Sequence, residues 1–216
     1  MAAGTTSGPD KGTAEGRSDL CALLSRSFAF PQQPFHADLL EGRWLDELSG
    51  LLEALPYRLD RGAAGAWRVP EDYERFQSEY IRLFEVGGRG GAPCPLYSGH
   101  YAGDRLRAME ELVRFYSFFG LSLSPGLMPD HVTVELEFMH FLSFQEIEAK
   151  QTGEDQASYL RAQRDFLQRQ MASWWPLLSA AVKRQRPLPF YRSLVALTGR
   201  VLDAERSYLE RALSRS

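Results

Sequence analysis

Apolar residues recur at spacings of three and four along almost the whole chain, which is the pattern of amphipathic helices that bury one face. Proline and glycine interrupt this pattern and mark the expected helix ends. The pattern predicts helices over residues 18–30, 35–55, 70–84, 103–119, 129–147, 154–175 and 189–213. No segment shows the strict alternation of a half-buried strand, and we find no internal repeat. We therefore expect an all-α fold, a single-domain bundle of six to eight helices.

Single residues suggest several helix boundaries. Ser18 or Asp19 is a suitable N-terminal cap for the first helix, and Pro70 is a suitable first residue for the third. Pro176 is expected to break or restart the sixth helix, because a proline inside a helix removes a hydrogen bond and clashes with the preceding turn. Residues 85–103 form a long connection rich in glycine and proline, and such loops are usually functional or disordered.

The stretch MPDHVTVELEFMHFLSFQE differs from the other helices because its apolar residues point in every direction. A helix that is apolar all round is normally buried at the centre of a fold. Pro129 is expected as its first helical residue, which puts Asp130 in the first turn, where a carboxylate complements the free amide groups. On a helical wheel His131 and Glu135 share one side, and Asp130 and Glu137 share another.

Charge is distributed unevenly along the chain. Residues 115–149 hold five acids and no Lys or Arg, whereas residues 150–216 hold twelve basic and six acidic residues. The basic half has the spacing of solvated helix faces with ion pairs four residues apart. Acids set among so many apolar residues need positively charged partners. The sequence leaves open whether these come from the basic half or from a bound molecule.

Composition narrows the class of protein. The chain has 216 residues, 44% of them apolar, which is enough for a packed core. Its formal charge of −3 argues against a nucleic-acid partner, because phosphate recognition usually needs a basic excess. Two distant cysteines, Cys21 and Cys94, suit a reducing cytosol. We expect a disordered tail over residues 1–16, which is neither a signal peptide nor an anchor, and one domain over 17–216.

No apolar run reaches the length that a bilayer span needs. We therefore expect a cytoplasmic protein without membrane insertion.

Three patterns could carry chemistry, and each is incomplete. Glu137 and His140 form half of the Glu-x-x-His signature of di-iron bundles, but no second pair exists, so we expect no metal site and a hydrogen-bonded His140. Cys94, His131 and Asp130 could form a hydrolytic set, but adjacent Asp and His on one helix point about 100° apart. The run GGRGG lacks the Lys and Ser/Thr of a phosphate-binding loop. We expect no catalytic residues and no enzyme activity.

Five segments resemble, in the same order, those of a known family. They are YIRLF (80–84), PLYSGHY (95–101), PDHVTVELEFMHFL (129–142), FLQRQMASWWPLL (166–178) and PFYRSLVALTGRVLDAE (189–205). Over residues 18–212 the chain resembles the TorD/DmsD/NarJ-type redox enzyme maturation chaperones. Residues 90–124 are most similar to the assembly chaperones of the type II DMSO-reductase group, which serve dimethylsulfide and ethylbenzene dehydrogenases and selenate and chlorate reductases.

The resemblance implies an all-helical fold of the TorD type, a cytoplasmic location and a function without chemistry. Members of this family bind the twin-arginine signal peptide of a molybdoenzyme catalytic subunit. They assist insertion of its molybdopterin guanine dinucleotide cofactor and prevent premature export by the Tat pathway. We expect the same here, with no cofactor stably bound by the chaperone itself, and as a monomer or a homodimer.

A twin-arginine peptide presents basic residues and then an apolar segment, so its receptor needs acids beside apolar surface. The expected binding residues are Pro129, Asp130, His131, Glu135, Glu137, Tyr80, Leu83, Phe84, Pro95, Tyr97 and Tyr101. Asp130, with Glu135 or Glu137, is expected to face the arginines, and the aromatic residues are expected to pack against the apolar segment. Two alternatives stay open, a general helical adaptor that binds a folded partner and a metal-dependent helical-bundle enzyme.

Overall fold

The computed structural model describes residues 14–87 and 91–215, and helices are the main secondary structure within them. The helices are α1 Ala14–Phe28, α2 Gln33–Leu40, α3 Arg43–Glu53, α4 Tyr73–Tyr80, α5 Arg105–Phe118, α6 Val132–Thr152, α7 Gln156–Phe166, α8 Ala172–Arg184 and α9 Pro189–Leu213. Short 3-10 helices lie at Ala64–Trp67 and Ser98–His100, and π-helical turns at Ile81–Glu85 (η2) and Leu167–Met171 (η4). Strands are absent from these residues, and one isolated backbone bridge joins Tyr97 and His131. The all-α prediction is confirmed.

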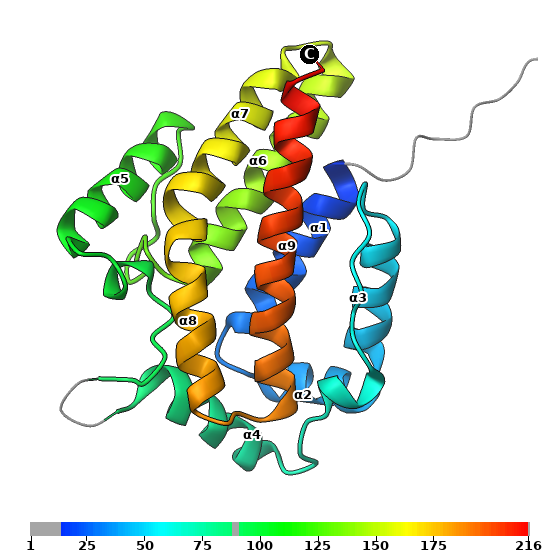
Figure 1. Ribbon diagram of the computed structural model, residues 1–216, viewed down its shortest axis with the longest axis vertical. Coiled ribbons are helices and arrows are strands. Elements are labelled where there is room, and N and C mark those ends of the chain that lie inside the picture. Colours follow the sequence, from blue (N-terminus) through cyan, green and yellow to red (C-terminus); the bar gives the residue numbers. More distant parts are fainter. Residues whose placement is uncertain (1–13, 88–90, 216) are drawn as a thin grey trace, which may run out of the picture.

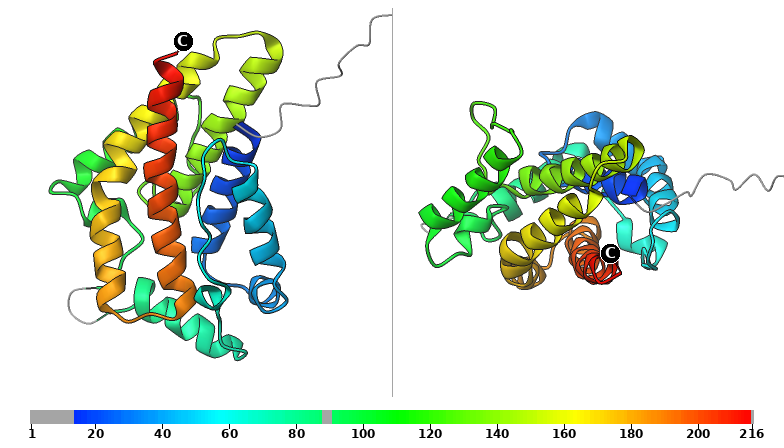
Figure 2. Two further views of the ribbon diagram at one scale, coloured as in Figure 1. Left: turned by 45° about the vertical axis from the view of Figure 1, so that its right-hand side comes forward. Right: turned by 90° about the horizontal axis from the view of Figure 1, so that it is seen from above.

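The helices form two layers around α6. In Figure 1, α7, α8 and α9 lie in front of α6 and α1, while α3 covers one edge and α5 projects from the other. Figure 2 shows the same two layers from above. Helix α6 is buried on several sides, through Val132, Leu136, Phe138, Met139 and Leu142. A helix that is apolar all round thus lies at the centre, as predicted.

Helices α7 and α8 form one continuous rod across the π-helical turn η4 (Figure 1). Pro176 lies inside α8 and neither breaks nor restarts it, so that prediction is wrong. Its exposed side chain follows shortly after η4, where the backbone already departs from the regular α-helical spacing. Because the two helices are continuous, the described part of the chain holds eight separate helical rods, within the predicted six to eight.

The predicted helix over 35–55 is two helices. Gly42 adopts a left-handed conformation (φ 81°) between α2 and α3, and this residue type takes that conformation without steric cost. The exposed Leu40 and the buried Trp44 lie on either side of this turn. The apolar spacing continued across Gly42, which is why the sequence pattern did not separate the helices.

Two predicted starts are also wrong. Helix α1 begins at Ala14, so Ser18 and Asp19 are interior residues and not caps. The expected tail therefore ends at least three residues early, and its residues 1–13 lie outside the described chain. Helix α4 begins at Tyr73, because the Asp72 side chain accepts from two backbone amides and caps it there.

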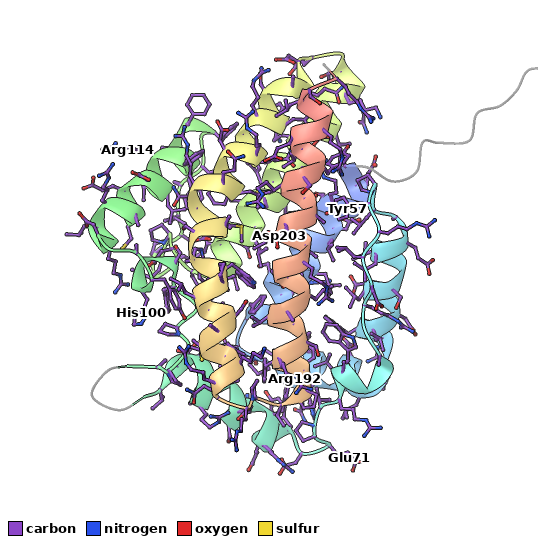
Figure 3. All side chains as sticks on the ribbon, viewed as in Figure 1. Tyr57, Glu71, His100, Arg114, Arg192 and Asp203 are labelled. Atoms are coloured by element: carbon purple, nitrogen blue, oxygen red, sulfur yellow. The ribbon has the colours of Figure 1, made fainter. Side chains whose placement is uncertain are left out.

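A buried ion network joins the two layers. Arg17 is fully buried in α1 and donates from Nε to Glu205 Oε1 at 2.6 Å and from Nη1 to Glu146 Oε2 at 3.0 Å. Its remaining nitrogen donates to Gln163. Tyr57, labelled in Figure 3 beside α9, donates to the second Glu205 oxygen at 2.7 Å. These contacts connect α1, α6, α7 and α9 through one guanidinium.

Candidate functional site

Three of the segments that carry the family resemblance meet at the start of α6. Two backbone hydrogen bonds of 2.8 Å join the tyrosine loop 95–101 to it, from Val132 N to Leu96 O and from Ser98 N to Asp130 O. A third bond, from the residue before this loop, ties it to a carbonyl of η2. Segments far apart in the sequence therefore form one local structure.

Residues 129–131 form the entry to α6 and are not part of it. His131 is the N-cap, with extended backbone, and its Nδ1 accepts from Thr133 N at 3.3 Å. The Pro129 carbonyl accepts from the Tyr116 hydroxyl at 2.8 Å. The prediction that Pro129 is the first helical residue is wrong, because His131 satisfies a free amide and fixes the start of the helix. Asp130 precedes the first turn, so its predicted wheel position does not apply.

The Asp130 carboxylate is fully buried, and neither of its oxygens has a hydrogen-bond partner among the described residues. Arg105, the first residue of α5, places its Nε 3.8 Å from Asp130 Oδ2, and its own side chain is 54% exposed. Gly99 lies between them. A Cβ atom at this position would come within 2.7 Å of Asp130 Oδ2 and 2.8 Å of Arg105 Cγ. The missing side chain of Gly99 therefore lets loop, acid and arginine approach one another.

Glu135 is a second fully buried acid near the start of α6. Burial raises the pKa of Glu135 to about 8, and the negative charge of Asp130 raises it further. The Trp174 indole donates to Glu135 Oε2 at 3.2 Å, which offsets only part of this increase. At neutral pH the neutral acid predominates. Glu135 therefore contributes little negative charge to a partner.

Burial also sets the protonation of two other titratable groups at the site. Burial lowers the pKa of His131 to about 4 and raises the pKa of Cys94 to about 11. At neutral pH the imidazole is neutral and the thiol is protonated. The His131 ring instead packs edge-on against Tyr97, with 4.9 Å between ring centroids.

The expected binding residues of the YIRLF segment belong to the core. Tyr80, Leu83 and Phe84 are each at most 2% exposed. The Tyr80 hydroxyl donates to the Phe28 carbonyl at 2.9 Å. These side chains support the site from beneath.

The tyrosine loop is held in a similar way. The Tyr101 hydroxyl donates to the Pro95 carbonyl at 3.1 Å, and its ring stacks on Trp174 with centroids 5.6 Å apart. Pro95 is buried. His100 of the same loop lies at the outer edge of the bundle below α5 (Figure 3). Pro95 and Tyr101 thus shape the loop, and Tyr97 is its member nearest to His131.

A surface groove of about 390 Å³ runs from the end of α1 to the start of α6, and we name it the α1–α6 groove. Its lining comprises Ser25, Arg26, Ala29, Phe30, Tyr80, Glu85, Tyr97, Gly126, Leu127, Met128, His131, Thr133, Val134 and Glu137. Four of the predicted binding residues are among them. The exposed fractions of Phe30 (40%) and Leu127 (50%) are large for apolar side chains, so the groove offers apolar surface.

Acids lie beside this apolar surface. Glu85 and Glu137 are both exposed, and Glu137 accepts a hydrogen bond of 3.3 Å from Ser25. Burial raises the pKa of the Tyr97 hydroxyl, the charges of Glu85 and Asp130 raise it further, and that of Arg105 lowers it. All three charges therefore surround one side chain of the groove. The arrangement suits a ligand that is cationic at one end and apolar at the other.

Two of the acids in residues 115–149 have cationic partners that precede this block in the sequence. Glu146 pairs with Arg17 of α1, and Asp130 pairs with Arg105 of α5. The ion pairs of the basic C-terminal half are local, from Arg161 to Asp155 for example. Within the described ranges, no ion pair joins the acidic block to that half.

The metal pattern around His140 has a structural explanation, and most of the phosphate pattern GGRGG lies outside the described residues. His140 Nδ1 lies 2.8 Å from Ser18 Oγ, so it is hydrogen-bonded to a neighbour as expected. Across residues 14–87 and 91–215, no three His, Cys, Asp or Glu side chains gather as metal ligands would. Residues 88–90 of the GGRGG run are outside these ranges.

Sequence reasoning missed several residues of the site. Phe30 was assigned to the apolar pattern of the first predicted helix, and Leu127 lies in the linker after Gly126, so neither was expected to line a groove. Glu85 directly follows the YIRLF segment as the last residue of η2, and it was treated as the start of a loop. Arg105 reads as an ordinary surface residue, because only the fold brings it to Asp130.

The sequence profile of the nitrate reductase delta subunit family matches residues 44–180. The chain belongs to this family. The resemblance to TorD/DmsD/NarJ-type chaperones is thereby confirmed. The family consists of assembly chaperones and not of catalytic enzymes, which agrees with the expectation that the protein is not an enzyme.

Relatives of this chain are themselves named as assembly chaperones. The chain is 32% identical to the perchlorate reductase assembly chaperone of Dechloromonas aromatica, over 87% of each chain. It is 32% identical to the dimethyl sulfide dehydrogenase assembly chaperone of Rhodovulum sulfidophilum, over 86% of this chain and 76% of the relative.

A solved structure shares the fold. The crystal structure of a proposed redox enzyme maturation protein from Archaeoglobus fulgidus aligns over 97% of both chains, with a TM-score of 0.50 and 19% identity. At this identity the likeness concerns the fold alone. In the described part of the chain, no helix is both long and apolar enough to cross a membrane.

Proposed function

We propose that this protein is a system-specific assembly chaperone of a molybdoenzyme. In this proposal it acts in the cytoplasm and binds the twin-arginine signal peptide and the apo form of the catalytic subunit. The observation that carries the proposal is the α1–α6 groove, where exposed apolar side chains and exposed acids meet. The chaperones of perchlorate reductase and dimethyl sulfide dehydrogenase support the client class.

The cationic end of the peptide lies, in this proposal, at the acidic side of the groove. Glu137 and Glu85 present exposed carboxylates, and Asp130 lies behind Tyr97. A guanidinium group pairs with such carboxylates through two parallel hydrogen bonds. Glu135 is omitted from the arginine contacts, because its acid is buried and mainly neutral at neutral pH.

The apolar part of the peptide continues past Phe30. A second groove of about 520 Å³ lies between α1 and α3 and shares Arg26, Ala29 and Phe30 with the first. Phe35 and the buried Trp44 are among its lining residues. Two adjoining grooves give an apolar helix or extended segment a longer path than either alone.

The chaperone assists molybdenum cofactor insertion by holding the client and not by binding the cofactor stably. A covered signal peptide is not available to the Tat export machinery, so export waits for release. The protein needs no catalytic residues for this function. Its only requirement is affinity for the unfinished client.

The test is a pull-down of the catalytic subunit with and without its signal peptide. We expect capture only when the signal peptide is present, and equal capture of both forms would instead indicate a general adaptor for a folded partner. Folded Asp130→Ala and His131→Ala proteins are expected to bind the isolated peptide about tenfold more weakly. Glu111→Ala, an exposed acid of α5, is the matched control. Unchanged affinity in both site variants would remove this stretch from the binding site.

A further inference from the structure

The pairing of Asp130 with Arg105 is unusual within this molecule. The carboxylate is completely buried, whereas the arginine side chain is 54% exposed. Their closest approach, 3.8 Å from Nε to Oδ2, is too long for a hydrogen bond. A buried carboxylate is normally hydrogen-bonded by its partner. Here both oxygens lack hydrogen bonds within the described residues.

Arg17 shows what a permanent partner looks like in the same fold. It is 1% exposed and contacts two carboxylates at 2.6 and 3.0 Å. Every one of its three guanidinium nitrogens donates to a side chain. By comparison, Arg105 provides charge to Asp130 without using its hydrogen-bonding groups.

The stem of Arg105 lies beside Gly99, which also adjoins the acid. Its Cγ would be 2.8 Å from a Cβ atom at Gly99, and that same Cβ would be 2.7 Å from Asp130 Oδ2. The stem of the arginine therefore packs against the glycine that adjoins the carboxylate. Because the arginine extends from the first residue of α5 and is half exposed, it can rotate away without unfolding a core element.

We propose that Arg105 is an exchangeable counter-ion of Asp130, which a guanidinium group of the client displaces on binding. This inference rests on the proposed function and adds a specificity-determining residue to it. In the free protein, Arg105 neutralises and covers the acid. In the complex, a client arginine with free donors replaces it and makes the hydrogen bonds that Arg105 leaves unmade.

A tethered competitor makes recognition more selective. Because Arg105 is attached beside the acid, its effective concentration there is on the order of millimolar. A lone arginine on an unrelated protein cannot displace it at cellular concentrations. A signal peptide can displace Arg105, because it gains further contacts in the α1–α6 groove. Arg105 thus raises the affinity that any ligand needs.

The experiment measures binding of two synthetic peptides, one with a twin-arginine pair followed by an apolar segment and one with both arginines replaced by glutamine. The Arg105→Ala protein is expected to bind the arginine peptide roughly two- to fivefold more tightly than the wild type, because the half-exposed Arg105 no longer competes for Asp130. Its affinity for the glutamine peptide is expected to be unchanged. Arg107→Ala is the control, since Arg107 is exposed on the same helix and pairs with Glu111.

A double-mutant cycle identifies the partner. In a folded Asp130→Asn background, Arg105→Ala is expected to have no effect on affinity for the arginine peptide. A second measurement needs no Asp130 variant. The Arg105 Nε–H NMR signal of the wild type, assigned by its loss in Arg105→Ala, is expected to shift towards that of a solvent-exposed arginine when the peptide is added.

Equal or weaker binding of the arginine peptide by Arg105→Ala overturns the inference, as does an Arg105 signal that the peptide leaves unchanged. These results leave the proposed function intact if the wild type still prefers the arginine peptide and Asp130→Asn weakens it. A wild type that binds the two peptides equally, or neither, contradicts the proposed function and this inference together.

Discussion

Glu135 lies inside the protein between the indole of Trp174 and the carboxylate of Asp130. Burial raises its pKa from 4.5 to about 8. Between these values the folded protein keeps a proton that the unfolded chain has lost. The resulting stability is full below pH 4.5 and is lost as the pH rises through 8.

Glu135→Gln is therefore expected to remove a pH dependence of stability. At pH 8.5 the variant should be more stable than the wild type by on the order of 5 kcal/mol, because the wild type must then bury a charged carboxylate and the amide carries no charge. Urea unfolding at several values from pH 7 to 9 measures this, above the range in which His131 titrates. Glu137→Gln, an exposed neighbour, is the control. If the free energy of unfolding depended on pH in the same way in Glu135→Gln and the wild type, Glu135 would not be a buried neutral acid.

Gly99→Ala tests the close approach of the tyrosine loop to Asp130. The new Cβ atom would lie 2.7 Å from a buried carboxylate oxygen, so the loop must shift. We expect the free energy of unfolding, measured with urea, to fall by about 1–3 kcal/mol. Gly103→Ala in the same connection meets no atom within 4 Å and is expected to be neutral or slightly stabilising. Equal effects of the two substitutions would contradict the observed packing.

At the scale of elements, apolar spacing predicted which parts of the chain form helices, but it did not predict where most of these helices begin and end. The last helix was predicted at 189–213 and is found there, since Pro189 begins it and its apolar stripe is uninterrupted. The starts of α4 and α6 depend on the caps Asp72 and His131. His131 is not a usual cap, and its position is set by the tyrosine loop, which no local pattern reveals.

Pro176→Ala tests how α8 accommodates a proline. An alanine restores the amide donor and removes the ring, so we expect the free energy of unfolding to rise by about 1–3 kcal/mol with unchanged helix content. Urea unfolding followed by circular dichroism measures both. Pro189→Ala, at the favourable first position of α9, should instead be neutral or destabilising. A less stable Pro176→Ala protein would mean that the proline is needed to hold the adjoining π-helical turn.

At the scale of the whole molecule, Arg17 holds the two layers together. Arg17→Met would leave Glu146 and Glu205 buried without their cation. We expect the free energy of unfolding, measured with urea, to fall by about 3–5 kcal/mol. Arg26→Met, in the same helix, breaks only an exposed pair with Glu47 and should change stability by less than about 1 kcal/mol. A small effect of Arg17→Met would show that water or rearrangement relieves the buried acids.

The fold class and the segments that form the site were predictable, whereas the roles of individual residues were not. Tyr97 and His131 line the groove as expected, but Leu83 and Phe84 lie beneath it. An apolar side chain in a motif looks the same in sequence whether it binds a partner or supports the loop that does. The role of Arg105 could not be predicted from the sequence, because its contact with Asp130 depends on where α5 packs in the fold.

The buried network around Arg17 also bears on the order in which the fold can be completed during synthesis. Arg17 is translated early, yet its partners Glu146 and Glu205 follow 129 and 188 residues later. Until α9 leaves the ribosome, α1 carries a cation that cannot be buried with both of its acids. The two layers can therefore be joined through Arg17 only after nearly the whole chain has been synthesised, so this part of the fold is completed last.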